Sequence, residues 1–220
     1  RFLHDTRAFN HFVKDMSVVV TEMFRDPDVF LAIREQVVPF LKTYPFIKIW
    51  HAGCASGQEV YSMAILLEEE GLLDRCHIYA TDFNDHALDT ARKGIYPDEE
   101  LPAYEKNYQL AGGKGVLSNY CVKQYNSIKF SGRLSERVVF ASHNLVTDGV
   151  FGEMNLVMCR NVLIYFNPTL QDRALSLLND SLCPRGFLCI GRRENLQFSV
   201  IRDSLEKVND PLRIYRKVAP

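Results

Sequence analysis

The sequence has 220 residues, of which 47% are hydrophobic, and its formal net charge is -1 at pH 7. This length suits one large domain or two small ones. The near-neutral charge gives no support for binding nucleic acid through its phosphates. The apolar runs are far shorter than the roughly 18 residues that a membrane-spanning helix needs. We therefore expect an ordinary globular protein that inserts into no membrane.

The cysteines and histidines do not indicate metal or disulfide chemistry. None of the six cysteines forms a CxxC pair, and several lie inside apolar runs. The six histidines show no ligand spacing such as HExxH. Because buried reduced thiols are ordinary in the cytoplasm, the sequence predicts a cytoplasmic protein without a metal site.

Strand-like and helix-like segments alternate along the chain. FIKIWHAG (46–53) is typical of a buried strand that ends in glycine, and GQEVYSMAILLEEEG (57–71) has the apolar spacing of a helix. Further strands are expected over 76–83, 137–145, 154–166, 186–191 and 212–218, and further helices over 84–94 and 168–182. Such apolar strands predict an α/β fold, a parallel sheet with helices on both faces that binds ligands beyond the carboxyl ends of its strands.

Two segments fall outside this alternation. Residues 1–45 look helical, and one helix is expected to begin with Asp26 as its N-cap and Pro27 as its first residue. Residues 97–136 include an aromatic-rich, strand-like stretch (119–132) that predicts a small inserted β-subdomain built on a hairpin. We therefore expect a helical linker over 1–45 and a main domain over 46–220 that carries this inserted lobe.

The glycine turn after the first expected strand predicts a nucleotide-like ligand. Gly53 lets the backbone approach a ligand and Gly57 opens the helix, but the third glycine of a dinucleotide fingerprint is missing. Asp82, at the end of the next strand, can accept hydrogen bonds from both hydroxyls of a ribose. Together these features favour S-adenosyl-L-methionine over a dinucleotide. The ordinary alternative for Asp82 is a helix N-cap or a turn residue.

Glu59, near the start of the same helix, has two possible roles. Ser56 and Glu59 fit the S-x-x-E capping box, which would satisfy free amides at the helix start. Alternatively, the carboxylate faces the ammonium or sulfonium region of the ligand. Spacing alone leaves both roles open.

Five blocks of the sequence resemble the chemotaxis receptor methyltransferases of the CheR type, in order and spacing over nearly the whole chain. They are TEMFRDPDVF (21–30), AGCASGQEVYS (52–62), ATDFNDHALDTARKGIY (80–96), HNL (143–145) and CRNVLIYF (159–166). The resemblance implies a Rossmann-like class I methyltransferase sheet that binds S-adenosyl-L-methionine. It also implies that glutamate side chains on receptor signalling helices are converted to γ-glutamyl methyl esters.

The same resemblance assigns roles to individual residues. Besides Gly53 of the turn, the residues expected to contact the cofactor are Thr21, Arg25, Glu59, Asp82, Asn144, Leu145, Asn161 and Val162. Arg25, whose guanidinium suits a carboxylate, and Tyr165, near the transfer site, are the predicted catalytic residues. Ordinary alternatives are a surface ion pair for Arg25, turn caps for the two asparagines and a core position for Tyr165.

A glutamate acceptor agrees with the lack of any Ser/His/Asp or Cys/His constellation. A carboxyl group with a pKa of about 4.3 is already ionised at neutral pH. The enzyme then has to align the reacting atoms and remove water rather than abstract a proton. The predicted partner is the cytoplasmic signalling domain of a chemoreceptor or a related signalling protein. The inserted lobe resembles the subdomain by which some family members dock a receptor tail peptide.

Several positions depart from the family pattern. They are Val19, Met23, Gln58, Val60 and the stretch GRREN (191–195), where GHSEN is common. Arg192 and Arg193 would either recruit an acidic acceptor or simply be solvated at the rim of the site. These departures keep two alternatives open, a cofactor-binding regulatory module that has lost transfer activity and a methyltransferase with another carboxylate acceptor.

Overall fold

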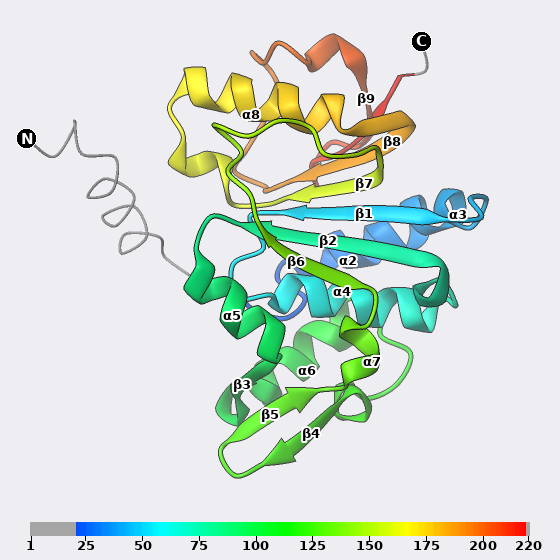
Figure 1. The fold of residues 1–220 in the computed structure, drawn as a ribbon. Helices are drawn as coiled ribbons and strands as arrows, with labels where there is room; N and C mark the ends of the chain where they lie inside the picture. Colours follow the sequence, from blue (N-terminus) through cyan, green and yellow to red (C-terminus); the bar gives the residue numbers. More distant parts are fainter. Residues whose placement is uncertain (1–20, 219–220) are drawn as a thin grey trace, which may run out of the picture.

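A computed structural model describes residues 21–218 of the chain. The expected helical content of residues 1–20, and the departure at Val19, lie outside the described residues. At the centre is a seven-stranded sheet in the order β6-β2-β1-β7-β8-β10-β9 (Figure 1). Its strands are β1 (Ile47–Ala52), β2 (Cys76–Asp82), β6 (Val138–Ser142), β7 (Met154–Cys159), β8 (Leu182–Ile190), β9 (Leu205–Asn209) and β10 (Ile214–Lys217).

The sheet is parallel except at one edge. β6, β2, β1, β7 and β8 run parallel, whereas β10 pairs antiparallel with both β8 and β9. Parallel strands place all their carboxyl ends at one edge of the sheet, so the segments that follow β1, β2, β7 and β8 meet there. The predicted α/β fold with a Rossmann-like methyltransferase sheet is confirmed.

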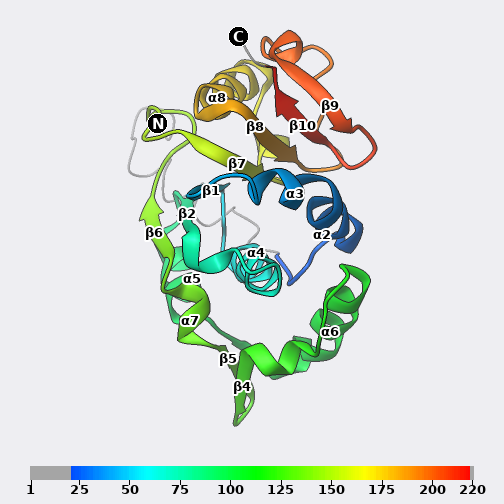
Figure 2. The ribbon, with the colours of Figure 1, turned by 90° about the vertical axis from the view of Figure 1, so that its right-hand side faces the viewer.

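Helices cover both faces of the sheet (Figure 2). On one face lie α2 (Pro27–Ala32), α3 (Val38–Leu41), α4 (Gln58–Glu69) and α5 (Asp85–Lys93), and on the other lies α8 (Pro168–Asp180). Successive strand residues point to opposite faces. In β1, Ile47 and Ile49 therefore join the core under α4, whereas Trp50 and Ala52 join the core under α8.

The first described helix changes its hydrogen-bond pattern midway. A π-helical segment, η2 (Ile33–Val37), separates α2 from α3. Pro39 has no N–H to donate to the carbonyl four residues earlier and its ring crowds that carbonyl, so the preceding turn widens. Asp26 occupies the predicted N-cap position, but its side chain makes no capping hydrogen bond.

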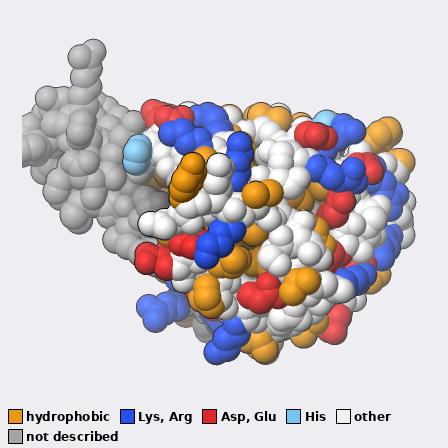
Figure 3. Space-filling view, turned by 90° about the horizontal axis from the view of Figure 1, so that it is seen from below, with side chains coloured by type: hydrophobic (Ala, Val, Ile, Leu, Met, Phe, Trp, Pro, Cys, Tyr) orange, Lys and Arg blue, Asp and Glu red, His pale blue; other side chains and the backbone are white. Residues whose placement is uncertain are grey.

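Within the segment predicted as a β-subdomain, the structure contains both a helix and strands. Its longest helix is α6 (Leu101–Leu110), and β4 (Cys121–Gln124) and β5 (Ser127–Phe130) form a hairpin. The strand β3 (Ile95–Pro97), at the start of the segment, pairs with β5. The short segments η3 (Leu73–Arg75), η4 (Asp98–Glu100), η5 (Leu117–Tyr120), α7 (Gly132–Ser135), η6 (Leu163–Tyr165) and η7 (Arg202–Ser204) complete the described elements. On the face that carries the lobe, acidic and basic side chains are interspersed (Figure 3).

Aromatic side chains pack the lobe onto the main domain. The ring of Tyr61 in α4 stacks on Phe130 of β5, with their centroids 5.2 Å apart. Tyr96 of β3 donates a hydrogen bond from its hydroxyl to the carbonyl of Ser56, at 2.7 Å. The lobe is therefore attached directly to the turn that follows β1.

Candidate functional site

The turn after β1 has an unusual backbone conformation. Gly53, Ala55 and Gly57 have φ values of 78°, 48° and 91°. The N–H groups of Gly53 and Cys54 both donate to the carbonyl of Thr81, at 2.8 and 2.9 Å, which fastens the turn to β2. Positive φ is accessible to glycine at little cost, so the two glycines allow the chain to reverse sharply at the end of the strand.

A second loop, which follows β7, packs directly against this turn. A Cβ atom added at Gly53 would lie 2.5 Å from Cγ2 of Val162. Asn161, next to Val162, has a φ of 61° and ends the run of extended backbone. The structure thus brings three predicted residues, Gly53, Asn161 and Val162, to one point beyond the strand ends.

Asp82 ends β2 and faces the same turn. Its Oδ2 accepts a hydrogen bond from the N–H of Ala55 at 2.8 Å, and its Oδ1 accepts one from the N–H of Asn84 at 2.9 Å. The N-cap of α5 is Asn84 rather than Asp82, because the Asn84 side chain accepts from His86 and Ala87. Burial raises the pKa of Asp82, and backbone hydrogen bonds from Asn84 and Ala55 oppose that rise.

Glu59 does not form the capping box. The hydroxyl of Ser56 donates instead to Oε1 of Gln58 at 2.8 Å, and α4 begins after Gly57 without a side-chain cap. The Glu59 carboxylate lies between His51 Nδ1 and Arg160 Nη1, each 2.9 Å away. Burial favours a raised pKa for Glu59, but the bonds from His51 and Arg160 outweigh it and lower the pKa.

Arg160, which the sequence analysis did not assign, connects Glu59 to the segment before α2. Its side chain is only 1% exposed, and it forms ion pairs with both Glu59 and Asp26. Its guanidinium also lies 5.8 Å from the centre of the Phe30 ring. A charged residue inside the apolar run MNLVMCRNVLIYF was the available signal, since such a residue is seldom buried unless it is paired.

The other predicted residues differ in how deeply they are buried. Arg25 and Thr21 are half-buried, and the neighbouring acids Asp26 and Asp28 pair with Arg160 and Arg192. Tyr165 is 61% exposed, which argues against a core position. Leu145 is buried, while Asn144 is exposed and its Oδ1 accepts from the N–H of Val146 at 2.9 Å, as the turn-cap alternative predicts.

Glu194 is a second residue that the sequence analysis missed. It is 5% exposed, and its carboxylate accepts hydrogen bonds from the N–H groups of Leu163, at 2.8 Å, and Gly191. Burial raises the pKa of Glu194, and backbone donors including Gly191 and Leu163 oppose the rise. Glu194 therefore joins the loops that follow β7 and β8.

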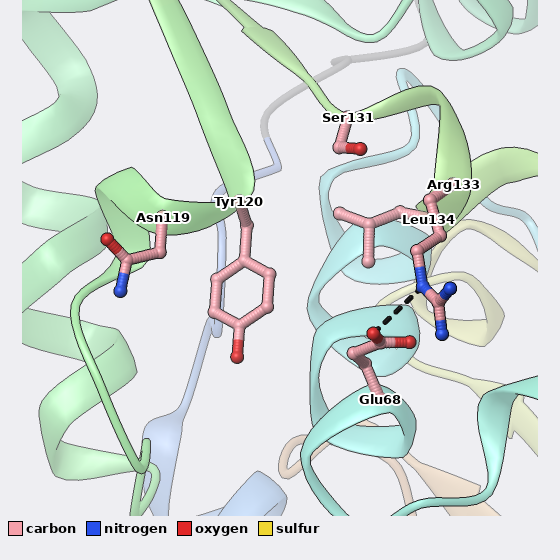
Figure 4. A pocket seen from close by; sticks show the side chains of 6 residues that line it. All are labelled: Glu68, Asn119, Tyr120, Ser131, Arg133 and Leu134. Atoms are coloured by element: carbon pink, nitrogen blue, oxygen red, sulfur yellow. Dashed lines mark hydrogen bonds and ion pairs between the residues drawn. The ribbon is translucent and has the colours of Figure 1, made fainter.

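A small pocket elsewhere on the molecule is not part of this site. It lies between α4 and the lobe and is lined by Glu68, Asn119, Tyr120, Ser131, Arg133 and Leu134 (Figure 4). Glu68 accepts a hydrogen bond from Nε of Arg133 at 2.9 Å. Because Glu68 and Gly57 lie at opposite ends of α4, the pocket is more than about 15 Å from the glycine turn.

The donors and acceptors at the strand ends suit S-adenosyl-L-methionine. A carboxylate has about four acceptor positions, and Asp82 and Glu59 each use two of them in the bonds described above. The remaining positions can accept from ribose hydroxyls and from an ammonium group. Across residues 21–218, no group of three or more His, Cys, Asp or Glu side chains could hold a metal ion, and no helix is long and apolar enough to cross a bilayer.

Comparisons with known proteins identify the family of this chain. The family described as "CheR methyltransferase, SAM binding domain" matches residues 19–211. A Pseudomonas putida protein named Cher3 is 53% identical over 99% of this chain and 80% of its own length. The chemotaxis protein methyltransferase of Vibrio anguillarum is 32% identical over 93% of this chain and 74% of its own length.

A solved structure supports the fold independently. The N-methyltransferase NodS of Bradyrhizobium japonicum, in complex with S-adenosyl-L-homocysteine, matches with a TM-score of 0.51 over 99% of this chain and 95% of its own. At 15% identity this likeness concerns the fold alone. The cofactor and the reaction class follow from the family match, and the chain belongs to the CheR family of S-adenosylmethionine-dependent methyltransferases.

Proposed function

We propose that this enzyme methylates glutamate side chains on the cytoplasmic signalling domain of a chemoreceptor, or of a related signalling protein, to give glutamyl methyl esters. Relatives from Vibrio anguillarum and Pseudomonas aeruginosa are named chemotaxis protein methyltransferases, and they are 32% and 31% identical to this chain. Their names support an acceptor in chemotaxis signalling. The choice of glutamate rests on the chemistry of the site.

The observation that carries the proposal is that the acids found at this edge of the sheet are already engaged. Glu59 is held between His51 and Arg160, Asp82 accepts two backbone N–H groups, and Glu194 accepts two more. None of these three is placed to serve as a free general base. An acceptor that is already ionised at neutral pH, such as a carboxylate, needs no base.

In this proposal each residue has a binding or orienting role. Asp82 accepts hydrogen bonds from the ribose hydroxyls, and Glu59 faces the ammonium group of the methionine part. Asn144, Leu145, Asn161 and Val162 hold the remainder of the cofactor, together with Thr21. Arg25 pairs with a carboxylate, and the exposed Tyr165 orients the acceptor oxygen at the rim.

The reaction then requires alignment more than proton transfer. S-adenosyl-L-methionine supplies an electrophilic methyl group, and its transfer to a carboxylate oxygen breaks the carbon–sulfur bond and leaves a neutral ester and a neutral thioether. The chain's own residues hold the acceptor in line and exclude water from its oxygen. Positioning of this kind can supply several kcal/mol of barrier lowering.

Transfer of a labelled methyl group tests the proposal. We expect purified receptor signalling domain to acquire label that is released by mild base, because esters hydrolyse and N-methyl groups do not. A receptor domain in which the candidate glutamates are replaced by glutamine is the matched control and should remain unlabelled. Label on small carboxylic acids instead would indicate another acceptor. Cofactor binding without any transfer would indicate a regulatory module.

A further inference from the structure

His51 is the residue whose surroundings the proposed reaction leaves unexplained. It lies in β1, is fully buried and points toward the face that α4 covers. Its Nδ1 lies 2.9 Å from Oε1 of Glu59. Within residues 21–218 its Nε2 is buried and has no hydrogen-bond partner.

A buried imidazole with one unpaired nitrogen is unfavourable for folding on its own account. An unpaired polar atom away from water destabilises the folded state, whereas an apolar side chain at that position would carry no such penalty. Ile47 and Ile49, which point to the same face of β1, are apolar and fully buried. The contribution of His51 must therefore lie in its other nitrogen.

The bond from Nδ1 fixes the orientation of the Glu59 carboxylate. Each oxygen of the Glu59 carboxylate has its own donor. Arg160, in the loop after β7, donates to Oε2, and His51, in β1, donates to Oε1. Because an ionised carboxylate only accepts hydrogen bonds, Nδ1 of His51 carries the hydrogen. The last torsion of a glutamate side chain is broad, and a single donor on one oxygen would leave the carboxylate plane free to rotate.

We propose that His51 is a positioning residue for the methyl-donor site, which acts by holding Glu59 in the orientation that receives the ammonium group of S-adenosyl-L-methionine. This inference rests on the proposed role of Glu59. It assigns no direct contact between His51 and the cofactor. Since His51 acts through Glu59, its effect on cofactor affinity must disappear once the Glu59 carboxylate is removed.

A double-mutant cycle on cofactor binding tests this dependence. Calorimetry would measure the affinity of S-adenosyl-L-homocysteine for the wild type, His51→Leu, Glu59→Gln and the double variant. When Glu59 is intact, we expect His51→Leu to weaken the binding of S-adenosyl-L-homocysteine about tenfold, because a hydrogen bond to a charged group is lost. In the Glu59→Gln background it should cause no further weakening. Equal weakening in both backgrounds would mean a merely structural role and would overturn the inference.

Further variants keep the test decisive. His51→Asn retains a donor at the position of Nδ1 and should bind within about threefold of the wild type. His51→Ser, whose hydroxyl is too short to reach Glu59, should bind as weakly as His51→Leu, and it replaces that variant if leucine prevents folding. His77→Leu, on the exposed start of β2 beside Lys48, is the matched control and should leave affinity unchanged.

The outcomes separate this inference from the function it rests on. If Glu59→Gln weakens binding and no His51 variant does, the positioning role is wrong and the assignment of Glu59 stands. If Glu59→Gln leaves binding unchanged, the assignment of Glu59 and the role of His51 are both wrong.

Discussion

Arg160 is a buried side chain that forms ion pairs with two acids of the site. It is 1% exposed and pairs with Glu59 and Asp26, so removing it leaves Glu59 with His51 alone and Asp26 with only the longer contact to Arg192, at 3.9 Å. Breaking a buried ion pair on one side costs about 3–5 kcal/mol. We expect Arg160→Met to lower the free energy of unfolding by about 3 kcal/mol and to weaken cofactor binding, as measured by urea unfolding and calorimetry.

Two further variants serve as controls for Arg160→Met. Arg173→Met, which removes an exposed arginine from α8, should change stability by less than about 0.5 kcal/mol. Arg160→Lys keeps the charge but cannot reach both acids with a planar fork, so its effect should lie between those of the other two variants. Full stability in Arg160→Met would show that the ion pairs do not support the fold.

Asp82 should control cofactor affinity more than turnover. Both of its oxygens accept backbone hydrogen bonds, and an asparagine offers only one such oxygen. We expect Asp82→Asn to weaken S-adenosyl-L-methionine binding about tenfold or more, while kcat at saturating cofactor falls much less. The exposed Asp89→Asn in α5 is the control. A loss confined to kcat would place Asp82 in the transfer step instead.

At the residue scale, the sequence identified side chains that lie beside a local motif. Gly53, Glu59 and Asp82 each stand near a strand end or a glycine turn, so position along the chain was enough to place them at one edge of the sheet. Arg160 and Glu194 depend on partners far away in the sequence, whereas His51 lies only eight residues before its partner Glu59. The bond between Arg160 and Asp26, for example, spans 134 residues. No short window contains both members of such a pair.

The turn between β1 and α4 depends on glycine for two separable reasons. At Gly53 the backbone has a φ of 78°, which is strained for any residue with a side chain, and an added Cβ would also lie 2.5 Å from Cγ2 of Val162. Gly71 has a similar φ of 69°, but an added Cβ there would have open space around it. We expect Gly71→Ala to cost about 1 kcal/mol from backbone strain alone. Gly53→Ala should cost about 2–4 kcal/mol and weaken cofactor binding, because overpacking adds to that strain.

A second substitution separates strain from overpacking in the same turn. Val162→Ala removes the atom that the new Cβ would meet, so it should recover part of the stability lost in Gly53→Ala. Unfolding free energies of the single and double variants measure this recovery. Equal costs at Gly53 and Gly71 would contradict the close packing of the two loops.

At the element scale, periodicity located the main strands but not their ends. The expected strand over 154–166 stops at Cys159, because Asn161 adopts a positive φ and the apolar residues after it form η6. A continuous apolar run does not reveal a single left-handed residue. α6 was missed because its apolar residues do not dominate one face, and β9 because it is a short edge strand with little apolar content.

At the scale of the whole molecule, one acidic cluster joins three parts of the fold. Consecutive glutamates lie at the C-terminal end of α4, where the helix dipole disfavours negative charge. Arg34 of η2 pairs with both Glu69 and Glu70, and Glu70 also pairs with Lys42 after α3 and Lys114 of the lobe. Cations from the N-terminal helices and from the lobe therefore converge on the central helix.

This convergence predicts how stability depends on pH. Burial favours a raised pKa for Glu70, but hydrogen bonds from Lys114, Lys42 and Arg34 prevail and lower the pKa from 4.5 to about 2. A carboxyl group whose pKa is lower in the folded state stabilises the fold fully above its unfolded pKa and loses that contribution as the pH falls toward the folded value. Since two of the cations are about half exposed, we expect a contribution of about 2 kcal/mol rather than the full shift.

Glu70→Gln should therefore be less stable than the wild type by about 2 kcal/mol at pH 7, and the difference should shrink as the pH falls from 4.5 toward 2. Urea unfolding at a series of pH values measures it. Glu206→Gln, on the exposed side of β9, is the control and should differ from the wild type by less than about 0.5 kcal/mol throughout. A Glu70→Gln difference that stays constant down to pH 3 would mean that packing, rather than the charge of Glu70, joins the lobe and the N-terminal helices to α4.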